Sequence, residues 1–233
     1  MLVTIHQPEH LPWLGFFNKA DQADILVLLD TVQFRKNYFQ NRNRILTSNG
    51  PSWLTVPVLM KGHISRTIKD MEIDCKQEWH CKHWRSIEVN YCKHKFFRDY
   101  GHFFKETYKR PWHLLAELNE HVIRFFFEAL GIKTKIVRAS DLGVSGSSSD
   151  LLLDICLKMK ADAYLAGQSA QDYLDETIFL DKGIEIVHHK FNHPEYAQRG
   201  QNAFVSHLST LDLIMNAGGE SIYIIRSGSG DAA

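Results

Sequence analysis

The stretch Leu2-Val3-Thr4-Ile5-His6-Gln7-Pro8-Glu9-His10-Leu11-Pro12-Trp13-Leu14-Gly15 decides the fold of this 233-residue chain. Its apolar start predicts a buried strand over residues 2–6, and Pro12 suits the first turn of a helix that we expect over residues 12–22. A second apolar run predicts a strand at 25–29 that ends beside Asp30. These residues predict a parallel βαβ unit with polar side chains at the carboxyl ends of both strands, where open α/β sheets bind ligands.

The rest of the chain continues this alternation of short apolar runs and amphipathic segments. Alternating strands and helices imply parallel βαβ units with right-handed crossovers. We expect an α/β fold with a mostly parallel, Rossmann-like sheet. The further elements that we expect are strands at 53–59, 135–138, 163–166 and 184–188 and a helix over 147–160.

The segment from about residue 75 to 130 interrupts the alternation. Apolar and aromatic residues recur there at helical spacing, and the pattern stops at Gly131, a residue that commonly ends helices. We therefore expect a helical insertion over 75–130 that packs over the mouth of the site. The predicted organisation is a single α/β domain over 1–226, followed by a disordered Ser-Gly-rich tail over 227–233.

Charge and composition exclude several classes of protein. The chain has 27 Lys and Arg and 27 Asp and Glu, so its formal net charge is zero, which argues against a general nucleic-acid or membrane-surface binder. A local basic pocket for one phosphorylated ligand remains compatible with this balance. No apolar run approaches the roughly 18 residues of a membrane span, and no signal peptide is visible. The four cysteines form no disulfide framework, so we expect a cytoplasmic protein with reduced thiols.

The turn after the first strand is one candidate site. A helix that begins near Pro12 presents unpaired backbone N–H groups, which suit a phosphate, and Gly15 permits close approach of a ligand to the backbone. His6 and His10 can donate hydrogen bonds to phosphoryl oxygens, and Gln7 lies between them. The alternative interpretation is a proline-stiffened loop around a core histidine.

The loop after the second strand is another candidate. Asp30 can hold a ribose hydroxyl, a substrate amine or a metal, while Arg42 offers a planar fork for phosphate or carboxylate. A solvated basic loop has a similar composition, but it rarely interleaves amides and aromatic residues so densely. The other candidate binding residues of this loop are Gln33, Lys36, Asn41 and Asn43.

Two further clusters have weaker signals. Gly167 ends the predicted strand at 163–166, and Tyr173 follows it, so both can face the same crevice; an ordinary βα loop explains them equally well. The cysteines and histidines between residues 75 and 94 match no standard zinc spacing, and we expect no metal there. The sequence also lacks a Gly-x-Gly-x-x-Gly fingerprint, a Walker A loop and a Gly-x-Ser-x-Gly elbow.

Taken together, these motifs resemble the WbqC-like family over about residues 3–219. The resemblance implies a bacterial protein encoded among genes for O-antigen and other surface polysaccharides. The residues that carry it are Gln7-Pro8, Pro12-x-x-Gly15, Asp30-x-Val32-Gln33-Phe34-x-Lys36, Asn41-Arg42-Asn43, Thr55-x-Pro57, Tyr91, Leu130-Gly131-Ile132, Tyr164-x-x-Gly167, Tyr173-Leu174, Tyr196, Ser209-x-x-Asp212 and Asn216-x-Gly218.

The layout of the first forty-five residues is also similar to that of nucleotidylyltransferases and pantothenate synthetase. With the implied pathway, this similarity favours transfer of an acyl or aminoacyl group to the amine of a nucleotide-linked amino sugar. Arg42 and Lys36 would bind phosphate, His6 or Asp30 would take the amine proton, and the helix N-terminus would meet the oxyanion. The expected co-substrate is an activated acyl or aminoacyl donor, or ATP. The alternatives are a nucleotidyl- or glycosyltransferase and a non-catalytic nucleotide-sugar-binding protein.

Overall fold

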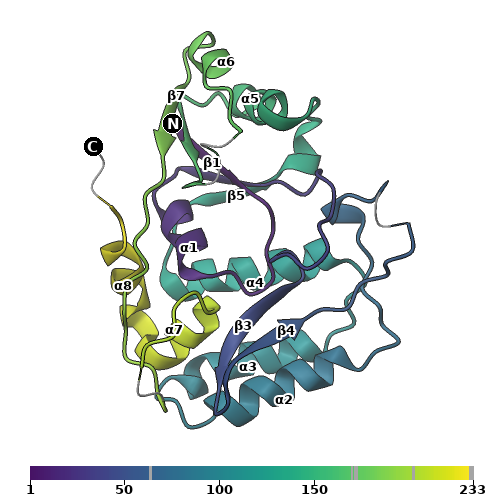
Figure 1. The fold of residues 1–233 in the computed structure, drawn as a ribbon, viewed down its shortest axis with the longest axis vertical. Coiled ribbons are helices and arrows are strands. Elements are labelled where there is room, and N and C mark those ends of the chain that lie inside the picture. Colours follow the sequence, from purple (N-terminus) through teal and green to yellow (C-terminus); the bar gives the residue numbers. More distant parts are fainter. Residues whose placement is uncertain (63–64, 169, 171–172, 201–202, 231–233) are drawn as a thin grey trace.

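A five-stranded parallel sheet forms the centre of the protein (Figure 1). The structure is a computed structural model that describes residues 1–62, 65–168, 170, 173–200 and 203–230. Within these residues the sheet has the order β5-β2-β1-β6-β7, and every neighbouring pair is parallel. Its strands are β1 (Leu2–His6), β2 (Ile25–Leu28), β5 (Lys135–Arg138), β6 (Ala163–Ala166) and β7 (Glu185–His188).

The order of the strands reverses between β1 and β6. The chain steps outward from β1 to β2 and β5, and it then crosses back to place β6 and β7 on the other side of β1. Val3 lies opposite Ile25 and Leu2 lies opposite Ala163 in the two pairings of β1. The expected parallel βαβ unit and the mostly parallel Rossmann-like sheet are thus confirmed. A crevice at such a reversal is the usual ligand site of this kind of sheet.

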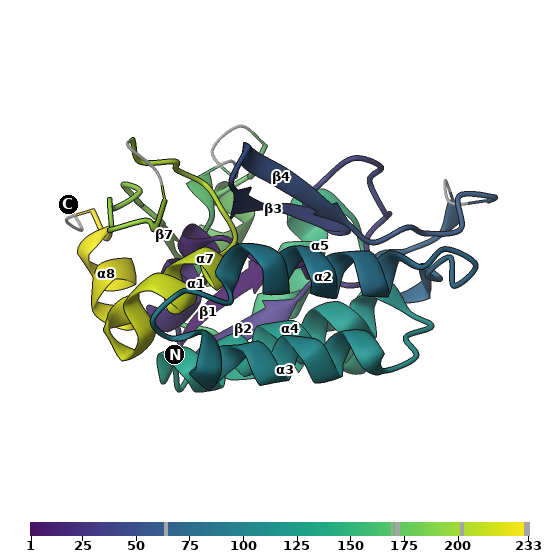
Figure 2. The same ribbon diagram turned by 90° about the horizontal axis from the view of Figure 1, so that it is seen from below.

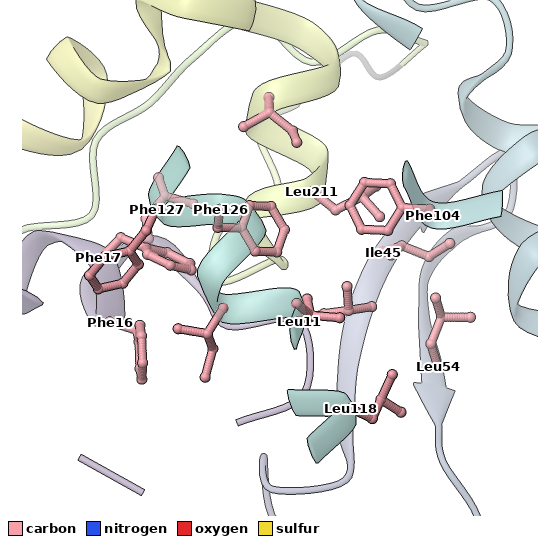
Figure 3. Close-up of a cluster of buried hydrophobic side chains, with 14 of the residues drawn as sticks. Leu11, Phe16, Phe17, Ile45, Leu54, Phe104, Leu118, Phe126, Phe127 and Leu211 are labelled. Carbon is pink, nitrogen blue, oxygen red and sulfur yellow. The ribbon is translucent and has the colours of Figure 1, made fainter. Parts of the chain in front are cut away.

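Side-chain alternation along the strands builds two cores. Leu26 and Leu28 contribute to the larger core, while Val27 and Leu29 contribute to the smaller one. The larger core lies against α1 (Leu14–Asp21) and α4 (Leu115–Leu130); Figure 3 shows Phe17 of α1 close to Phe126 and Phe127 of α4. The smaller core contains apolar residues of α5 (Ser148–Lys158) and α6 (Thr177–Leu180), so helices cover both faces of the sheet.

The strand expected at 53–59 is wrong in its bounds, and the strand found there does not belong to the parallel sheet. The structure instead has an antiparallel hairpin of β3 (Arg42–Thr47) and β4 (Gly50–Thr55), which forms a separate two-stranded sheet. Gly50 follows the turn with a φ of 95°, a conformation that favours glycine. The inner face of the hairpin buries Ile45 and Leu54 in the larger core (Figure 3).

Three helices occupy the predicted insertion. The pair α2 (Trp79–Tyr91) and α3 (Phe97–Lys109) lies beneath the β3–β4 hairpin (Figure 2), whereas α4 packs against the parallel sheet as a crossover helix. Gly131 ends α4 with a φ of 71°. None of the described cavity-lining residues comes from these helices, so the expectation that the insertion covers the mouth of the site is wrong.

Two C-terminal helices complete the larger core. The side chain of Ser209 caps α7 (Thr210–Ala217) by accepting a hydrogen bond from the Leu211 amide, and α8 (Ser221–Ser227) follows. Residues 228–230 continue with backbone hydrogen bonds to Lys190 and Asn192, so the expected disordered tail does not begin at residue 227; residues 231–233 lie outside the described residues. Short 3₁₀ turns lie at Ile68–Asp70, Ala139–Leu142 and Gly218–Glu220.

Candidate functional site

A cavity of about 660 Å³ opens at the reversal point of the sheet. His6 and Gln7 line it from the carboxyl end of β1, Gly167 from the end of β6 and His189 from just after β7. This volume lies within the range of small-molecule sites, and the position is where open α/β sheets bind their ligands. The cavity is therefore the candidate functional site.

Helix α1 presents one face to this cavity. Gly15 and Lys19 are four residues apart, so they lie on the same side of the helix and both line the cavity. A side chain at Gly15 has no room, because an added Cβ would lie 2.3 Å from the Trp13 ring. The same indole stacks on His207, with ring centroids 5.5 Å apart. Trp13 thus covers the first turn of α1, where the sequence suggested a phosphate.

Lys19 is the most unusual charged residue of the site. Its side chain is only 4% exposed, and Nζ donates a hydrogen bond of 3.0 Å to the backbone carbonyl of Ile5. Burial lowers the pKa of Lys19 to about 7, although the charge of Glu9 opposes this shift. Gly167 lies beside this amine, and a Cβ there would be in ordinary van der Waals contact with Nζ at 3.6 Å. A neutral amine at this position is accessible near pH 7.

Glu9 is the second buried ionisable group that lines the cavity. It is 5% exposed, and its Oε2 atom has no hydrogen-bond partner among the described residues. Burial raises the pKa of Glu9 to about 8, and the charge of Lys19 lowers it only in part. At neutral pH this carboxyl is therefore largely protonated and can donate a hydrogen bond to a ligand.

Two histidines face the cavity in the neutral form. Burial, followed by the charge of Lys19, lowers the pKa of His6 to about 3 and that of His189 to about 4. His6 Nδ1 donates to the Gln7 carbonyl at 3.0 Å, which leaves Nε2 as an acceptor. His189 Nε2 contacts Asn18 Oδ1 at 2.8 Å, so this ring is held from α1. Both rings are suited to orienting a polar ligand.

A hydrogen-bonded chain ties the floor of the cavity to its rim. The side chain of Gln7 accepts from Gln40 Nε2 at 2.7 Å, and Gln40 Oε1 accepts from the Arg35 amide at 2.8 Å. Arg35 and Tyr38 line the cavity at this rim, with the guanidinium 4.7 Å from the centre of the Tyr38 ring. The loop after β2 is thereby positioned relative to the end of β1.

The structure brings five of the predicted site residues to this cavity: His6, Gln7, Gly15, Gly167 and Tyr173. The others lie elsewhere. Gln33 and Lys36 are exposed on the loop after β2, outside the lining of the cavity.

Asp30 faces away from the cavity although it follows β2. Residues alternate between the faces of a strand, so Leu29 lines the main cavity while Asp30 points toward α4. There its carboxylate accepts from the amide and the hydroxyl of Ser140, at 3.0 and 2.6 Å. Asp30 also lines a second cavity of about 280 Å³ with Glu120 and Arg138.

His10 lies in the interior, close to α3 and α4. It is fully buried, with Nδ1 3.3 Å from Asn119 Oδ1 and Nε2 3.4 Å from the Tyr108 hydroxyl. Asn119 also donates to the carbonyls of Pro8 and Gln40. This arrangement supports the loop that carries Gln7 and Glu9, so the role of His10 is to hold that loop in place and not to contact a ligand in the cavity.

The asparagines of the Asn41-Arg42-Asn43 motif point inward. Asn41 donates to the Val56 carbonyl at 2.8 Å, which joins the two open ends of the hairpin. Asn43 donates to the Leu11 carbonyl at 2.7 Å, which ties the hairpin to the turn before α1. Arg42 points outward from β3 and lies over Trp53, 4.4 Å from the ring centre. All three are outside the lining of the cavity.

No group of three or more His, Cys, Asp or Glu residues is arranged to hold a metal ion within the part of the chain that the structure describes. Cys75, Cys81 and Cys92 are exposed, and His83 is buried with Nε2 3.1 Å from the Thr55 carbonyl. Nor is any helix among the described residues both long and apolar enough to cross a bilayer.

The site residues predicted from the sequence do not include Glu9, Trp13 or Lys19. Lys19 could have been found, because it lies one helical turn after Gly15, on the face that a site at Gly15 requires. Nothing in the local pattern distinguishes Glu9, which is buried by the fold around it.

Fold and cavity define a Rossmann-like α/β protein with a ligand-sized crevice at its topological switch point. The chain belongs to the WbqC-like protein family, whose model matches residues 7–224. It is 32% identical over 222 residues to the uncharacterized protein Rv1507c of Mycobacterium tuberculosis, covering 94% of this chain and 95% of that protein. No solved structure gives a significant match. Membership of this family suggests a role in polysaccharide biosynthesis.

Proposed function

We propose that this protein transfers an acyl or aminoacyl group to the amine of a nucleotide-linked amino sugar, as a step in surface polysaccharide assembly. The observation that carries the proposal is the buried Lys19, whose amine borders a cavity of about 660 Å³ and has a pKa lowered to about 7. An amine that attacks an activated carbonyl must lose a proton, and a neutral lysine is a suitable base for that step near neutral pH.

Lys19 and Glu9 supply complementary groups for the transfer. The bond from the sugar nitrogen to the acyl carbon forms, and the bond from that carbon to the leaving oxygen or sulfur breaks. Lys19 takes the proton that the amine loses, and the protonated Glu9 donates one to the leaving atom. His6 Nε2 accepts a hydrogen bond from the substrate and orients it. These roles replace those suggested for Asp30 and the first turn of α1.

The position of the cavity supports a nucleotide-linked substrate. Crevices at this point of a doubly wound sheet bind nucleotides in many unrelated proteins, which is support by analogy of fold. A nucleotidyl- or glycosyltransferase would use the same crevice, but its reaction would release pyrophosphate or a nucleotide and would form no amide. A non-catalytic sugar-binding protein would give no product.

Incubation with nucleotide-linked amino sugars and activated acyl or aminoacyl donors tests the proposal. A thermal-shift screen first identifies the sugar, because a ligand at a hundred times its dissociation constant adds about 2.7 kcal/mol of stability. Mass spectrometry of the products should then show an amide on the sugar nitrogen with the nucleotide retained. Stabilisation by a sugar without amide formation from any donor would exclude acyl transfer and favour the binding role.

A further inference from the structure

Basic residues are concentrated in one part of this neutral chain. Residues 31–69 contain no Asp or Glu, although the whole chain has as many acidic as basic residues. One of the seven basic residues, Arg66, is paired with Glu72. The seven are Arg35, Lys36, Arg42, Arg44, Lys61, Arg66 and Lys69.

The outer face of the β3–β4 hairpin combines two of these arginines with an exposed tryptophan. Arg42 and Arg44 are two residues apart and share this face, and Trp53 lies opposite Arg44 on β4. Their guanidinium carbons are 4.4 and 5.7 Å from the centre of the indole, which is 44% exposed. Each guanidinium donates to a backbone carbonyl, and no carboxylate among the described residues pairs with either.

This face is continuous with the rim of the cavity. Phe39 lines the cavity, and its ring centroid is 6.1 Å from that of Trp53. Tyr38, which is 39% exposed, also lines the cavity and stacks on Arg35. We call this row the aromatic–arginine strip. It consists of Arg35, Tyr38, Phe39, Arg42, Arg44 and Trp53.

Exposed aromatic rings beside arginines are the groups that bind single-stranded nucleic acids. Bases stack on the rings, and the guanidinium groups neutralise the phosphates. A surface that binds an apolar partner would not present Arg35, Arg42 and Arg44 without acidic residues to neutralise them. A mononucleotide within the cavity would not need the outer face of the hairpin.

We propose that the aromatic–arginine strip binds the single-stranded 3′ end of an RNA, with a base on Trp53 and phosphates on Arg42 and Arg44. The terminal nucleotide then enters the cavity past Arg35 and Tyr38. That this end carries an aminoacyl ester rests on the proposed function. In that case the sugar amine attacks the ester carbonyl, the bond from carbon to the ribose oxygen breaks, and the proton passes through Lys19 and Glu9 to that oxygen.

Fluorescence anisotropy with a labelled single-stranded RNA hexamer ending in 3′-CCA tests the proposal, since it needs neither sugar nor turnover. Trp53→Ala should weaken binding on the order of ten- to hundredfold, and Trp53→Phe should restore most of it. Arg42→Ala should weaken binding and reduce the slope of log affinity against log salt by about 0.7. Tyr223→Ala and Arg85→Ala, which change an exposed aromatic and an exposed arginine outside the strip, should bind like the parent.

Three results would overturn the proposal. The first is that uridine diphosphate binds as tightly as the hexamer and depends on Trp53 to the same extent. This result would mean that the strip binds the nucleotide of the sugar substrate. Equal affinity for a duplex of the same sequence would exclude stacking of an unpaired base. Absence of hexamer binding by a correctly folded protein would exclude RNA altogether, while amide formation from other donors would still be measured separately.

Discussion

Lys19 of α1 and Ile5 of β1 are joined inside the cavity by a hydrogen bond of 3.0 Å from Nζ to the backbone carbonyl. The bond holds the amine at the carboxyl end of the central strand, where the sheet order reverses. It also gives the buried amine, which lines the cavity, one polar partner.

Lys19→Met should reduce kcat by about 10²- to 10⁴-fold, the usual contribution of a general base, with little change in KM for the nucleotide sugar. Methionine keeps the unbranched shape and most of the length of the lysine side chain but lacks the amine that accepts the proton. Steady-state kinetics measures the effect, with the sugar identified by the thermal-shift screen and the donor identified by mass spectrometry of the products. Lys105→Met, at an exposed position of α3, is the matched control and should behave as the parent. If the kcat of Lys19→Met equals that of the parent, Lys19 is not the general base.

The pH profile of kcat/KM should be bell-shaped, with its maximum between about 7 and 8. Lys19, with a pKa of about 7, must lose its proton to act as the base, so the rate rises through pH 7. Glu9, with a pKa of about 8, must keep its proton to act as the acid, so the rate falls above pH 8. Glu9→Gln should abolish the alkaline limb and retain the acid one. A profile of Glu9→Gln that still falls above pH 8 would contradict the assignment.

Gly15→Ala should destabilise the protein by about 1–3 kcal/mol, because the new methyl group would lie 2.3 Å from the Trp13 ring and force it to move. The same substitution in a Trp13→Leu background should be neutral or slightly stabilising, since alanine favours the helix. Urea unfolding of the parent, the two single variants and the double variant gives the coupling energy. Gly219→Ala, where no atom lies within 4 Å of the added Cβ, is the control. Additive effects of the two substitutions would disprove the steric contact.

Stability should fall as the pH drops below about 6.5. Burial lowers the pKa of His6 and His10 to about 3 and that of His83 and His189 to about 4 in the folded state. The unfolded state therefore binds protons first, and each histidine reduces the free energy of unfolding by up to about 1.4 kcal/mol per pH unit. Glu9 acts in the opposite direction, because its raised pKa lets the folded state bind one proton more.

Urea midpoints at pH 7.5 and 5.5 measure this acid sensitivity. His10→Gln should make the dependence on pH shallower, whereas His102→Gln, at an exposed position, should leave it unchanged. If the urea midpoint stays constant or rises as the pH is lowered from 7.5 to 5.5, the buried histidines do not govern the loss of stability in acid.

The cysteines and histidines between residues 75 and 94 should hold no stoichiometric zinc. Cys75, Cys81 and Cys92 should react with a thiol reagent without unfolding the protein, while the buried Cys156 should resist. Elemental analysis of protein purified without chelators measures the metal directly. One zinc per chain, released together with loss of α2 helicity, would overturn this prediction.

Sequence patterns predicted the elements whose signals are local. The apolar runs at 2–6 and 25–29 with the helix between them predicted a parallel pair, and Gly131 marked the end of a helix. The hairpin escaped prediction because the buried face of β3 includes Asn43, so the strand lacks a simple alternation of apolar and polar residues. The Asn43 side chain donates a hydrogen bond to the carbonyl of Leu11, which is a contact between segments distant in the sequence.

By itself, the sequence determined the α/β layout and placed His6, Gln7, Gly15 and Gly167 at the ends of strands and the start of a helix, because periodicity and helix-ending residues act over a few positions. Only the tertiary structure decided which polar residues share the cavity. It turned Asp30 to the opposite face of the sheet and buried Lys19 and Glu9 beside the switch point. Burial and the face that a residue presents depend on packing between segments far apart in the chain, and that packing sets the pKa values on which the proposed chemistry depends.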